Sequence, residues 1–262
     1  MHRMRDKLSV VKIGGNVIED EKALDVFLTT FSKLEGLKIL VHGGGKLATQ
    51  LATKLGIESK LIDGRRITDK DTVDIITMVY GGLANKKIVA QLQSKNINAI
   101  GLSGADGNSI HAHKRPVKDI DYGFVGDIES IDSDLLTNLL SINLTPIFCA
   151  ISHDGNGQLL NTNADTIAAE IAIGMASIYE TTLYYCFEKK GVLLDITDDD
   201  SVVKHINTPK YNELLADGII ADGMIPKLHN CFYALQNNVE KVCLGDVSML
   251  NENAELFTTL KL

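Results

Sequence analysis

The stretch Ile39-Leu-Val-His-Gly-Gly-Gly-Lys46 joins an apolar run to three consecutive glycines. A short apolar run bounded by glycine is typical of a buried strand, and Leu47, Leu51 and Leu55 then recur at helical spacing. Glycine lets a ligand approach backbone N–H groups closely, and the start of a helix favours an anion. The stretch therefore predicts an anion-binding turn between a strand and a helix over 46–55.

A second strand with the same ending lies near the start of the chain. The apolar run over 8–13 contains Lys12 and stops at Gly14 and Gly15. A helical pattern over 23–34 follows, and the strand at 39–42 comes next. Strands that alternate with helices over short connections indicate a parallel sheet covered by helices, so the predicted fold class is α/β.

The rest of the chain continues the alternation of strands and helices. The sequence texture changes near residues 175–180, so we expect one lobe over 1–176 and a second over 177–262. The predicted helices cover 70–95, capped by Thr68 or Asp69, and 132–140, 208–216 and 228–237, with a further helix from Asp165 to 176. The predicted strands cover 97–102, 145–151, 177–186, 191–194 and 239–244, which is the last of the chain. We also expect a loop or short hairpin at 60–68 and a β-hairpin over 111–127.

Composition excludes several classes of protein. The 262 residues carry a net charge of −8, which offers no basic footprint for nucleic acid. The sequence contains neither an apolar signal-peptide core nor a run of about 18 apolar residues that could cross a membrane. The four cysteines are scattered, which favours reduced, buried thiols in a cytoplasmic protein.

Three polar residues are open to both a structural and a functional interpretation. Lys12 lies within an apolar strand, where an unpaired charge is unfavourable; snorkelling or pairing with a carboxylate is the alternative to a functional role. Lys227 is placed at a predicted helix start, where the helix dipole disfavours a cation. Asp165 follows Asn163 at another helix start, where either side chain can serve as a cap or as part of a site.

Glycine turns that carry a lysine suit phosphoryl transfer, which depends on positioning and charge neutralisation. The chain lacks the Walker A spacing and the third spaced glycine of a dinucleotide fingerprint. Arg65 and Arg66 suit a carboxylate, although solvated surface arginines are the alternative. The dispersed histidines and cysteines indicate neither a covalent nucleophile nor a protein metal site.

Six motifs, in this order, resemble those of the N-acetylglutamate kinases, which belong to the amino acid kinase family. The resemblance covers nearly the whole chain. It implies an open three-layer αβα sandwich with a mainly parallel central sheet, an N-terminal lobe for the acyl amino acid and a C-terminal lobe for ATP. The motifs are Lys12-Ile-Gly-Gly15, Val41-His-Gly-Gly-Gly45, Gly64-Arg-Arg-Ile-Thr68, Gly101-Leu-Ser-Gly-Ala-Asp-Gly107, Asn161-Thr-Asn-Ala-Asp165 and Asp222-Gly-Met-Ile-Pro-Lys227.

The resemblance implies ATP-dependent phosphorylation of the γ-carboxylate of N-acetyl-L-glutamate, the second step of arginine biosynthesis. Lys12 and Lys227 match the lysines that neutralise the transferred phosphoryl group, and Asp165 matches the carboxylate that holds them. Mg²⁺ is expected to be carried by ATP. The implied substrate-binding residues are Gly44, Gly45, Arg65, Arg66, Asn161 and Asn163, and the implied phosphoryl- and ATP-binding residues are Gly14, Gly15, Gly43, Glu188, Gly191, Ile220 and Asp222.

The chain departs from the family pattern in three places. Phe187-Glu188 replaces the usual Ser/Thr-Asp pair at the nucleotide edge, which puts adenine or ribose recognition in doubt. The chain lacks the additional N-terminal helix and the C-terminal Gly-x-Gly-Thr of arginine-inhibited hexameric members, which points to a homodimer without arginine feedback. Arg65 stands where leucine is usual.

Arg65 suggests an alternative substrate. A second guanidinium would complement the additional carboxylate of N-succinyl-L-glutamate, whereas neighbouring side chains of an extended segment point to opposite faces and would leave Arg65 in solvent. Further alternatives are another amino acid kinase and a non-catalytic amino-acid sensor, although a sensor has no need of Lys12, Lys227 and Asp165 together. A nucleotide-dependent oxidoreductase is disfavoured by the missing dinucleotide spacing.

Overall fold

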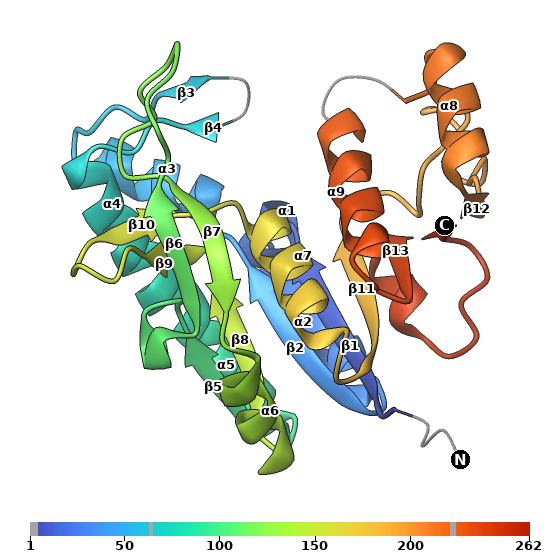
Figure 1. The fold of residues 1–262 in the computed structure, drawn as a ribbon, viewed down its shortest axis with the longest axis horizontal. Coiled ribbons are helices and arrows are strands. Elements are labelled where there is room, and N and C mark those ends of the chain that lie inside the picture. Colours follow the sequence, from blue (N-terminus) through green and yellow to red (C-terminus); the bar gives the residue numbers. More distant parts are fainter. Residues whose placement is uncertain (1–4, 63–64, 221–223) are drawn as a thin grey trace.

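The computed structural model describes residues 5–62, 65–220 and 224–262 and places an eight-stranded sheet between two layers of helices (Figure 1). The strand order is β12-β14-β13-β11-β1-β2-β8-β5. Neighbours from β13 to β5 pair in parallel, whereas β14 is antiparallel to β13. The predicted αβα sandwich is confirmed. The strands are β1 (Lys7–Ile13), β2 (Leu37–His42), β5 (Ala99–Leu102), β8 (Thr145–Cys149), β11 (Glu180–Cys186), β12 (His205–Ile206), β13 (Lys241–Gly245) and β14 (Thr258–Leu260).

Two smaller sheets lie on the side of the central sheet that ends in β8 and β5 (Figure 1). The hairpin expected over 111–127 is confirmed as an antiparallel pair that extends into a four-stranded sheet. The short hairpin at 60–68 is also present. These strands are β6 (Ile110–Lys114), β7 (Gly126–Ile131), β9 (Ile151–His153) and β10 (Leu159–Asn161) in one sheet, and β3 (Leu61–Ile62) and β4 (Arg65–Arg66) in the other.

Each face of the central sheet has its own hydrophobic core. Leu8 and Val10 pack with α7 and α9 on one face, whereas Val11 and Ile13 pack with α2 and α5 on the other. Because side chains alternate along a strand, Lys12 shares the α7 face with Val10. The α-helices are α1 (Gly15–Glu19), α2 (Glu21–Lys33), α3 (Gly45–Lys54), α4 (Lys70–Ile76), α5 (Asn85–Ser94), α6 (Ser133–Ser141), α7 (Ala164–Met175), α8 (Thr208–Ala216) and α9 (Met224–Gln236).

The helix expected over 70–95 is present, with a π-helical segment inside it. Asp69 caps its start by accepting a hydrogen bond from Thr72 N at 2.8 Å. The π segment η1 (Thr77–Ala84) separates α4 from α5. Such segments often occur at functional sites, and here η1 places Tyr80 against Gly44.

Three predicted strands were wrong in extent. The strand expected over 177–186 begins only at Glu180. The run over 145–151 is divided between β8 in the central sheet and β9 in the four-stranded sheet, because the chain bends at the buried Ala150. Residues 191–194 form no regular strand; Leu193 makes a single bridge to Val202, and Val192 N donates to Thr258 Oγ1 instead.

The C-terminal part also differs from the prediction. The helix expected over 228–237 already includes Met224 in α9, because Pro226 falls in its first turn, where a missing N–H is tolerated. Strand β13 is followed by β14, which the sequence pattern did not indicate. The short strand β12 was missed as well.

Candidate active site

The two glycine turns lie side by side at the carboxyl ends of β1 and β2. These strands pair in parallel with Ile13 opposite His42, so the turns that follow them begin at the same edge of the sheet. Helices α1 and α3 start at Gly15 and Gly45 and direct their N-terminal N–H groups to this edge. A cavity of about 300 Å³ lies here, lined by Lys12, Ile13, Gly15, Asn16, Gly43, Gly44, Gly45, Lys46, Ala164 and Glu188.

Asp165 holds two lysines from opposite ends of the chain. Lys12 Nζ lies 2.7 Å from Asp165 Oδ1, and Lys227 Nζ lies 3.0 Å from Asp165 Oδ2. The three residues come from β1, α7 and α9. The α7 dipole favours Asp165 in the first turn, whereas the α9 dipole disfavours Lys227 in its own first turn. The carboxylate therefore compensates for the placement of both ammonium groups.

The charge state of Asp165 follows from these contacts. Burial alone would raise the pKa of its carboxyl group, but the charges and hydrogen bonds of Lys12 and Lys227 outweigh burial and lower the pKa to about 2. Asp165 is therefore ionised at neutral pH. The cluster carries one negative and two positive charges, so it presents net positive charge to a ligand.

Two aromatic rings support Lys227. Its Nζ lies 5.3 Å from the ring centroid of Tyr185 and 5.8 Å from that of Phe187. An aromatic face attracts a cation at these distances. The hydroxyl of Tyr185 also donates to the backbone oxygen of Asp165 at 3.0 Å. Strand β11 and its extension therefore fix both members of the ion pair.

Gly44 needs to be glycine. Its φ of +156° lies at the limit of the range that favours glycine, and an added Cβ would come within 2.8 Å of the Tyr80 ring. Gly43 and Gly45 have more room at the Cβ position. The close packing of Tyr80 against Gly44 fixes the path of the turn.

Arg66 reaches the glycine turn from strand β4. Its Nη2 donates to Gly45 O at 2.8 Å and to Thr49 Oγ1 at 2.7 Å. Arg66 is half-buried, whereas the neighbouring Arg65 is exposed. The structure therefore brings Arg66 to the predicted anion site, and the exposure of Arg65 agrees with the solvent-facing alternative.

Asn161 and Asn163 flank the entrance to α7. Asn161 Nδ2 donates to Thr68 Oγ1 at 3.0 Å, which ties β10 to the segment that follows Arg66. Asn163 caps α7, since its Oδ1 accepts from Asp165 N at 2.7 Å and Thr166 N at 3.2 Å. The cap expected from the sequence is present.

Glu188 joins the glycine turns through a polar chain. Asn16 Nδ2 donates to Glu188 Oε1, and Lys46 Nζ donates to Asn16 Oδ1. Lys46 Nζ also lies 3.9 Å from Glu19 Oε2. Glu188 therefore lines the same cavity as Lys12, although it replaces the residue usual in the family.

The remaining predicted nucleotide residues have separate positions. Gly14 N donates to Cys186 O at 3.1 Å between β1 and β11, and Gly191 packs so closely on Thr258 that an added Cβ would lie 2.6 Å from Oγ1. The Ile220 side chain is buried in the core. Asp222 lies outside the described residues.

Several residues of the site were missed from the sequence. Thr49 lies one helical turn after Gly45, a spacing that places both on one face of α3, and it contacts Arg66. Tyr185 and Asn16 had no sequence signal of their own, and Phe187 was singled out only as a departure from the family pattern. Their contacts in the site arise only when β11 packs beside β1.

Across 5–62, 65–220 and 224–262, no group of three or more His, Cys, Asp or Glu side chains could hold a metal ion. Over the same residues, no helix combines the length and apolar character needed to cross a membrane.

Known proteins resemble this chain in both sequence and structure. The model of the amino acid kinase family matches residues 7–246. The acetylglutamate kinase of Phocaeicola vulgatus is 53% identical over 251 residues, covering 96% of this chain and 98% of the relative. That of Cytophaga hutchinsonii is 51% identical over 259 residues, covering 97% and 98%.

A solved structure supports the same fold. The carbamate kinase of Giardia lamblia, solved with bound AMP-PNP, superposes with a TM-score of 0.67 at 13% identity and covers 100% of this chain and 99% of its own. The fold, the order of the motifs and the sequence identity agree. The chain belongs to the amino acid kinase family.

Proposed function

We propose that this protein is an acetylglutamate kinase, which transfers the γ-phosphoryl group of ATP to the γ-carboxylate of N-acetyl-L-glutamate. The product is N-acetyl-L-glutamyl 5-phosphate, and the reaction is the second step of arginine biosynthesis. The observation that carries the proposal is the pairing of Lys12 and Lys227 on Asp165 beside two glycine turns. Relatives of that name share about half of its residues over nearly the full length.

The chemistry needs charge neutralisation more than proton transfer. A glutamate side chain has a pKa of about 4.3, so the attacking carboxylate is already ionised at neutral pH. Its oxygen forms a bond to the γ-phosphorus while the bond from phosphorus to the ADP oxygen breaks. No general base is required, and Asp165, with a pKa of about 2, is not suited to act as one. Asp165 instead holds the two lysines in place.

The two lysines stabilise the phosphoryl group while it is transferred from ATP to the carboxylate. During in-line transfer, negative charge spreads over its three equatorial oxygens, which preorganised donors and cations stabilise. Lys12 approaches from β1, and Lys227 approaches from α9. The N–H groups of Gly15, Gly44 and Gly45 supply further donors from the starts of α1 and α3.

Arg66 is proposed to hold the α-carboxylate of the acyl amino acid. A guanidinium has five N–H donors, and the Nη2 group is used by Gly45 O and Thr49 Oγ1. The N–H groups on Nε and Nη1 point in different directions, so each can donate singly to an oxygen of the substrate. Asn161 and Asn163 provide polar groups nearby. A succinyl substrate is not favoured, because the relatives are acetylglutamate kinases and Arg65 is exposed.

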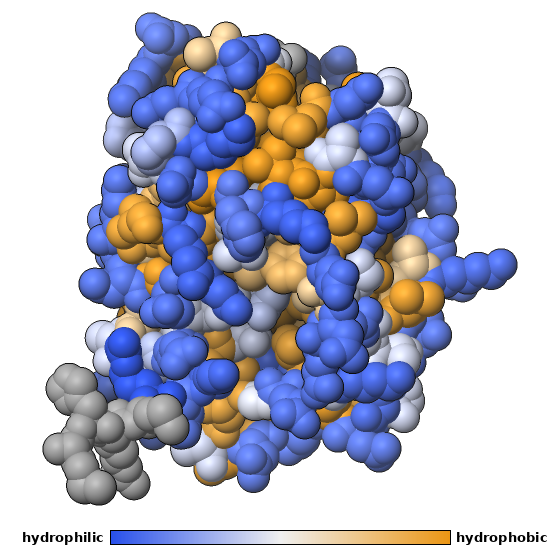
Figure 2. All heavy atoms as spheres, turned by 90° about the vertical axis from the view of Figure 1, so that its right-hand side faces the viewer, coloured by the Kyte–Doolittle hydropathy of each residue, from blue (hydrophilic) through white to orange (hydrophobic). Residues whose placement is uncertain are grey.

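ATP is proposed to bind mainly to the lobe formed by residues 177–262, with Mg²⁺ carried on its phosphates. This lobe contains the predicted nucleotide-binding residues Glu188, Gly191, Ile220 and Asp222 in its sequence. On the side of the molecule that carries α8, hydrophobic residues form a band in the upper half between hydrophilic side chains (Figure 2), a surface of the kind that suits an adenine ring. The lobe of residues 1–176 would bind the acyl amino acid and form a homodimer.

An ADP-release assay tests the proposal. N-acetyl-L-glutamate should stimulate ADP release in the presence of MgATP, whereas L-glutamate and N-acetyl-L-aspartate should not. If N-acetyl-L-glutamate gave no stimulation, the proposed function would be wrong.

Two neighbouring arginines provide a matched pair of variants. Arg66→Lys should raise KM for N-acetyl-L-glutamate by about 10-fold or more, because a single ammonium group cannot contact Gly45 O, Thr49 Oγ1 and the substrate in the directions that the planar guanidinium provides. Arg65→Lys should change this KM by less than about twofold, as expected for an exposed side chain. Equal effects of the two substitutions would contradict the assignment of Arg66.

A further inference from the structure

Every carbonyl of the three-glycine turn is hydrogen-bonded. Gly43 O lies 2.8 Å from His42 Nδ1, and Gly44 O accepts from Ala48 N at 2.9 Å. Gly45 O accepts from Arg66 and from Thr49. A trans peptide holds its C=O and the following N–H on opposite sides, so each contact also sets the direction of the next N–H group. The contact to Gly43 O therefore fixes the direction of the N–H of Gly44, a residue that lines the cavity.

His42 can make this contact in one tautomer only. Asn85 Nδ2 lies 3.0 Å from His42 Nε2 and 2.9 Å from Ile147 O. Because a carbonyl oxygen only accepts, the amide nitrogen of Asn85 faces Ile147 and also donates to His42 Nε2. His42 Nε2 is then the acceptor, and Nδ1 carries the hydrogen that is donated to Gly43 O.

The surroundings also keep the imidazole neutral. His42 is fully buried at the end of β2, and burial lowers the pKa of its ring to about 4, with a further lowering from the charge of Lys86. A second proton on Nε2 would face the N–H of Asn85, which is itself a donor. His42 therefore remains a neutral donor to Gly43 at neutral pH.

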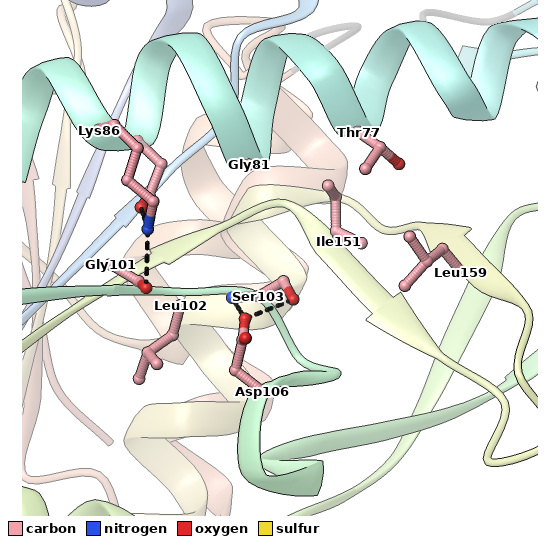
Figure 3. Close-up of a pocket in the computed structure, with 10 residues that line it drawn as sticks. Thr77, Gly81, Lys86, Gly101, Leu102, Ser103, Asp106, Ile151 and Leu159 are labelled. Atoms are coloured by element: carbon pink, nitrogen blue, oxygen red, sulfur yellow. Dashed lines mark hydrogen bonds between the residues drawn. The ribbon is translucent and has the colours of Figure 1, made fainter.

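The hydrogen-bonded chain continues beyond Asn85. Lys86 Nζ donates to Asn85 Oδ1 and to Gly101 O, both at 3.1 Å (Figure 3). An added Cβ at Gly101 would lie 1.8 Å from Asn85 Oδ1, so glycine is required there. Asn85, Lys86 and Gly101 line a second cavity of about 210 Å³. The orientation of Asn85 is thus fixed from several directions.

We propose that His42 is a positioning residue for phosphoryl transfer. Its imidazole, held in the Nδ1–H tautomer by Asn85, orients the peptide between Gly43 and Gly44 so that the Gly44 N–H points at the transferred phosphoryl group. His42 acts through Gly44 and does not touch the substrate. The inference rests on the proposed function. It assigns a role to His42, a residue of the motif Val41-His-Gly-Gly-Gly45 to which the resemblance gave none.

Two amide substitutions separate the contacts of the ring. His42→Asn places an N–H near the position of Nδ1 and can still donate to Gly43 O. His42→Gln places its amide near Nε2, so it can contact Asn85 but not Gly43. We expect His42→Gln to lower kcat by about 30-fold or more, while His42→Asn stays within about fivefold of the wild type and KM for both substrates changes little. Equal losses in the two variants, or no loss in His42→Gln, would overturn the proposal.

NMR of the substrate-free protein tests the same contacts without activity. Long-range ¹H–¹⁵N correlations of the ring should show a protonated Nδ1 and an unprotonated Nε2 for His42, unchanged from about pH 5 to 8. The opposite tautomer, or titration near neutral pH, would overturn the inference even if neither variant folds. If wild-type protein fails to release ADP with N-acetyl-L-glutamate while this tautomer is observed, the proposed function is wrong and the orientation of Gly44 by His42 stands.

Discussion

Two lysines on adjacent central strands, Lys12 and Lys38, show how a largely buried ammonium group can be structural or functional. Lys38, near the start of β2, is 8% exposed, and its Nζ donates to Phe31 O, Ser32 O and Leu34 O at 3.0, 3.0 and 2.6 Å. These carbonyls belong to the C-terminal end of α2, where the dipole favours a cation. All three hydrogens of Lys38 are thus used within the protein.

Lys12, near the end of β1, has a different partner. It contacts Asp165, and this carboxylate is shared with Lys227. One negative charge balances only one of the two ammonium groups, so the cluster retains positive charge beside the cavity. The partner of a buried lysine, rather than its burial, therefore indicates whether the lysine can bind a ligand.

Removing the shared partner should give the largest effect. Asp165→Asn leaves two ammonium groups close together without a counter-charge, so both should move away from the phosphoryl position. We expect kcat to fall by about 10²–10³-fold. Glu170→Gln is the control, since Glu170 is a half-buried carboxylate on the same helix α7, and its kcat should stay within about twofold of the wild type. Similar losses in both variants would indicate a general effect of α7.

The structural lysine should affect stability instead. Lys38→Met leaves three carbonyls at the end of α2 without their donor, and it should lower the free energy of unfolding by about 1–3 kcal/mol. At a temperature where the variant is folded, kcat should remain within about twofold of the wild type. Urea denaturation and the ADP-release assay measure the two quantities. A large loss of kcat at unchanged stability would contradict the comparison.

Acid should weaken the Asp165 cluster selectively. The pKa of Asp165 is about 2 in the folded protein against the ordinary aspartate value of 3.8, so its ion pairs contribute stability above about pH 4, and this stability is lost as the pH falls through 2. The difference corresponds to about 2 kcal/mol. Unfolding free energies measured between pH 5 and 2 should show this loss in wild type and in Lys38→Met, but not in Asp165→Asn. An equal pH dependence in all three proteins would rule out the low pKa.

The main elements of the fold could be predicted from local patterns. Apolar runs ending in glycine identified β1 and β2, and helical spacing identified α2, α3 and α7. The short strands β12 and β14 could not be predicted, because two or three residues carry too little periodicity. Their pairing is also non-local, since β14 pairs with β13 and the edge strand β12 pairs with β14. The bend at Ala150 likewise depends on contacts between sheets.

The site was predictable only in part, for a similar reason. Lys12, Asp165 and Lys227 were identified by their motifs, and the structure brings them together. The apolar strand pattern by itself does not distinguish Lys12 from Lys38, and the sequence does not place Tyr185 or Phe187 beside Lys227. Those contacts join strands and helices distant in sequence.

The most direct test of phosphoryl transfer at the Lys12–Asp165–Lys227 cluster is the steady-state kinetics of Lys12→Ala beside Lys38→Ala. We expect kcat of Lys12→Ala to fall by about 10²-fold or more, with KM for ATP and N-acetyl-L-glutamate changed by less than about threefold, because the lysine acts on charge that develops during transfer. Lys38→Ala, assayed where it is folded, should keep kcat within about twofold. A pure KM effect in Lys12→Ala, or equal kcat losses in both variants, would contradict the catalytic role of Lys12.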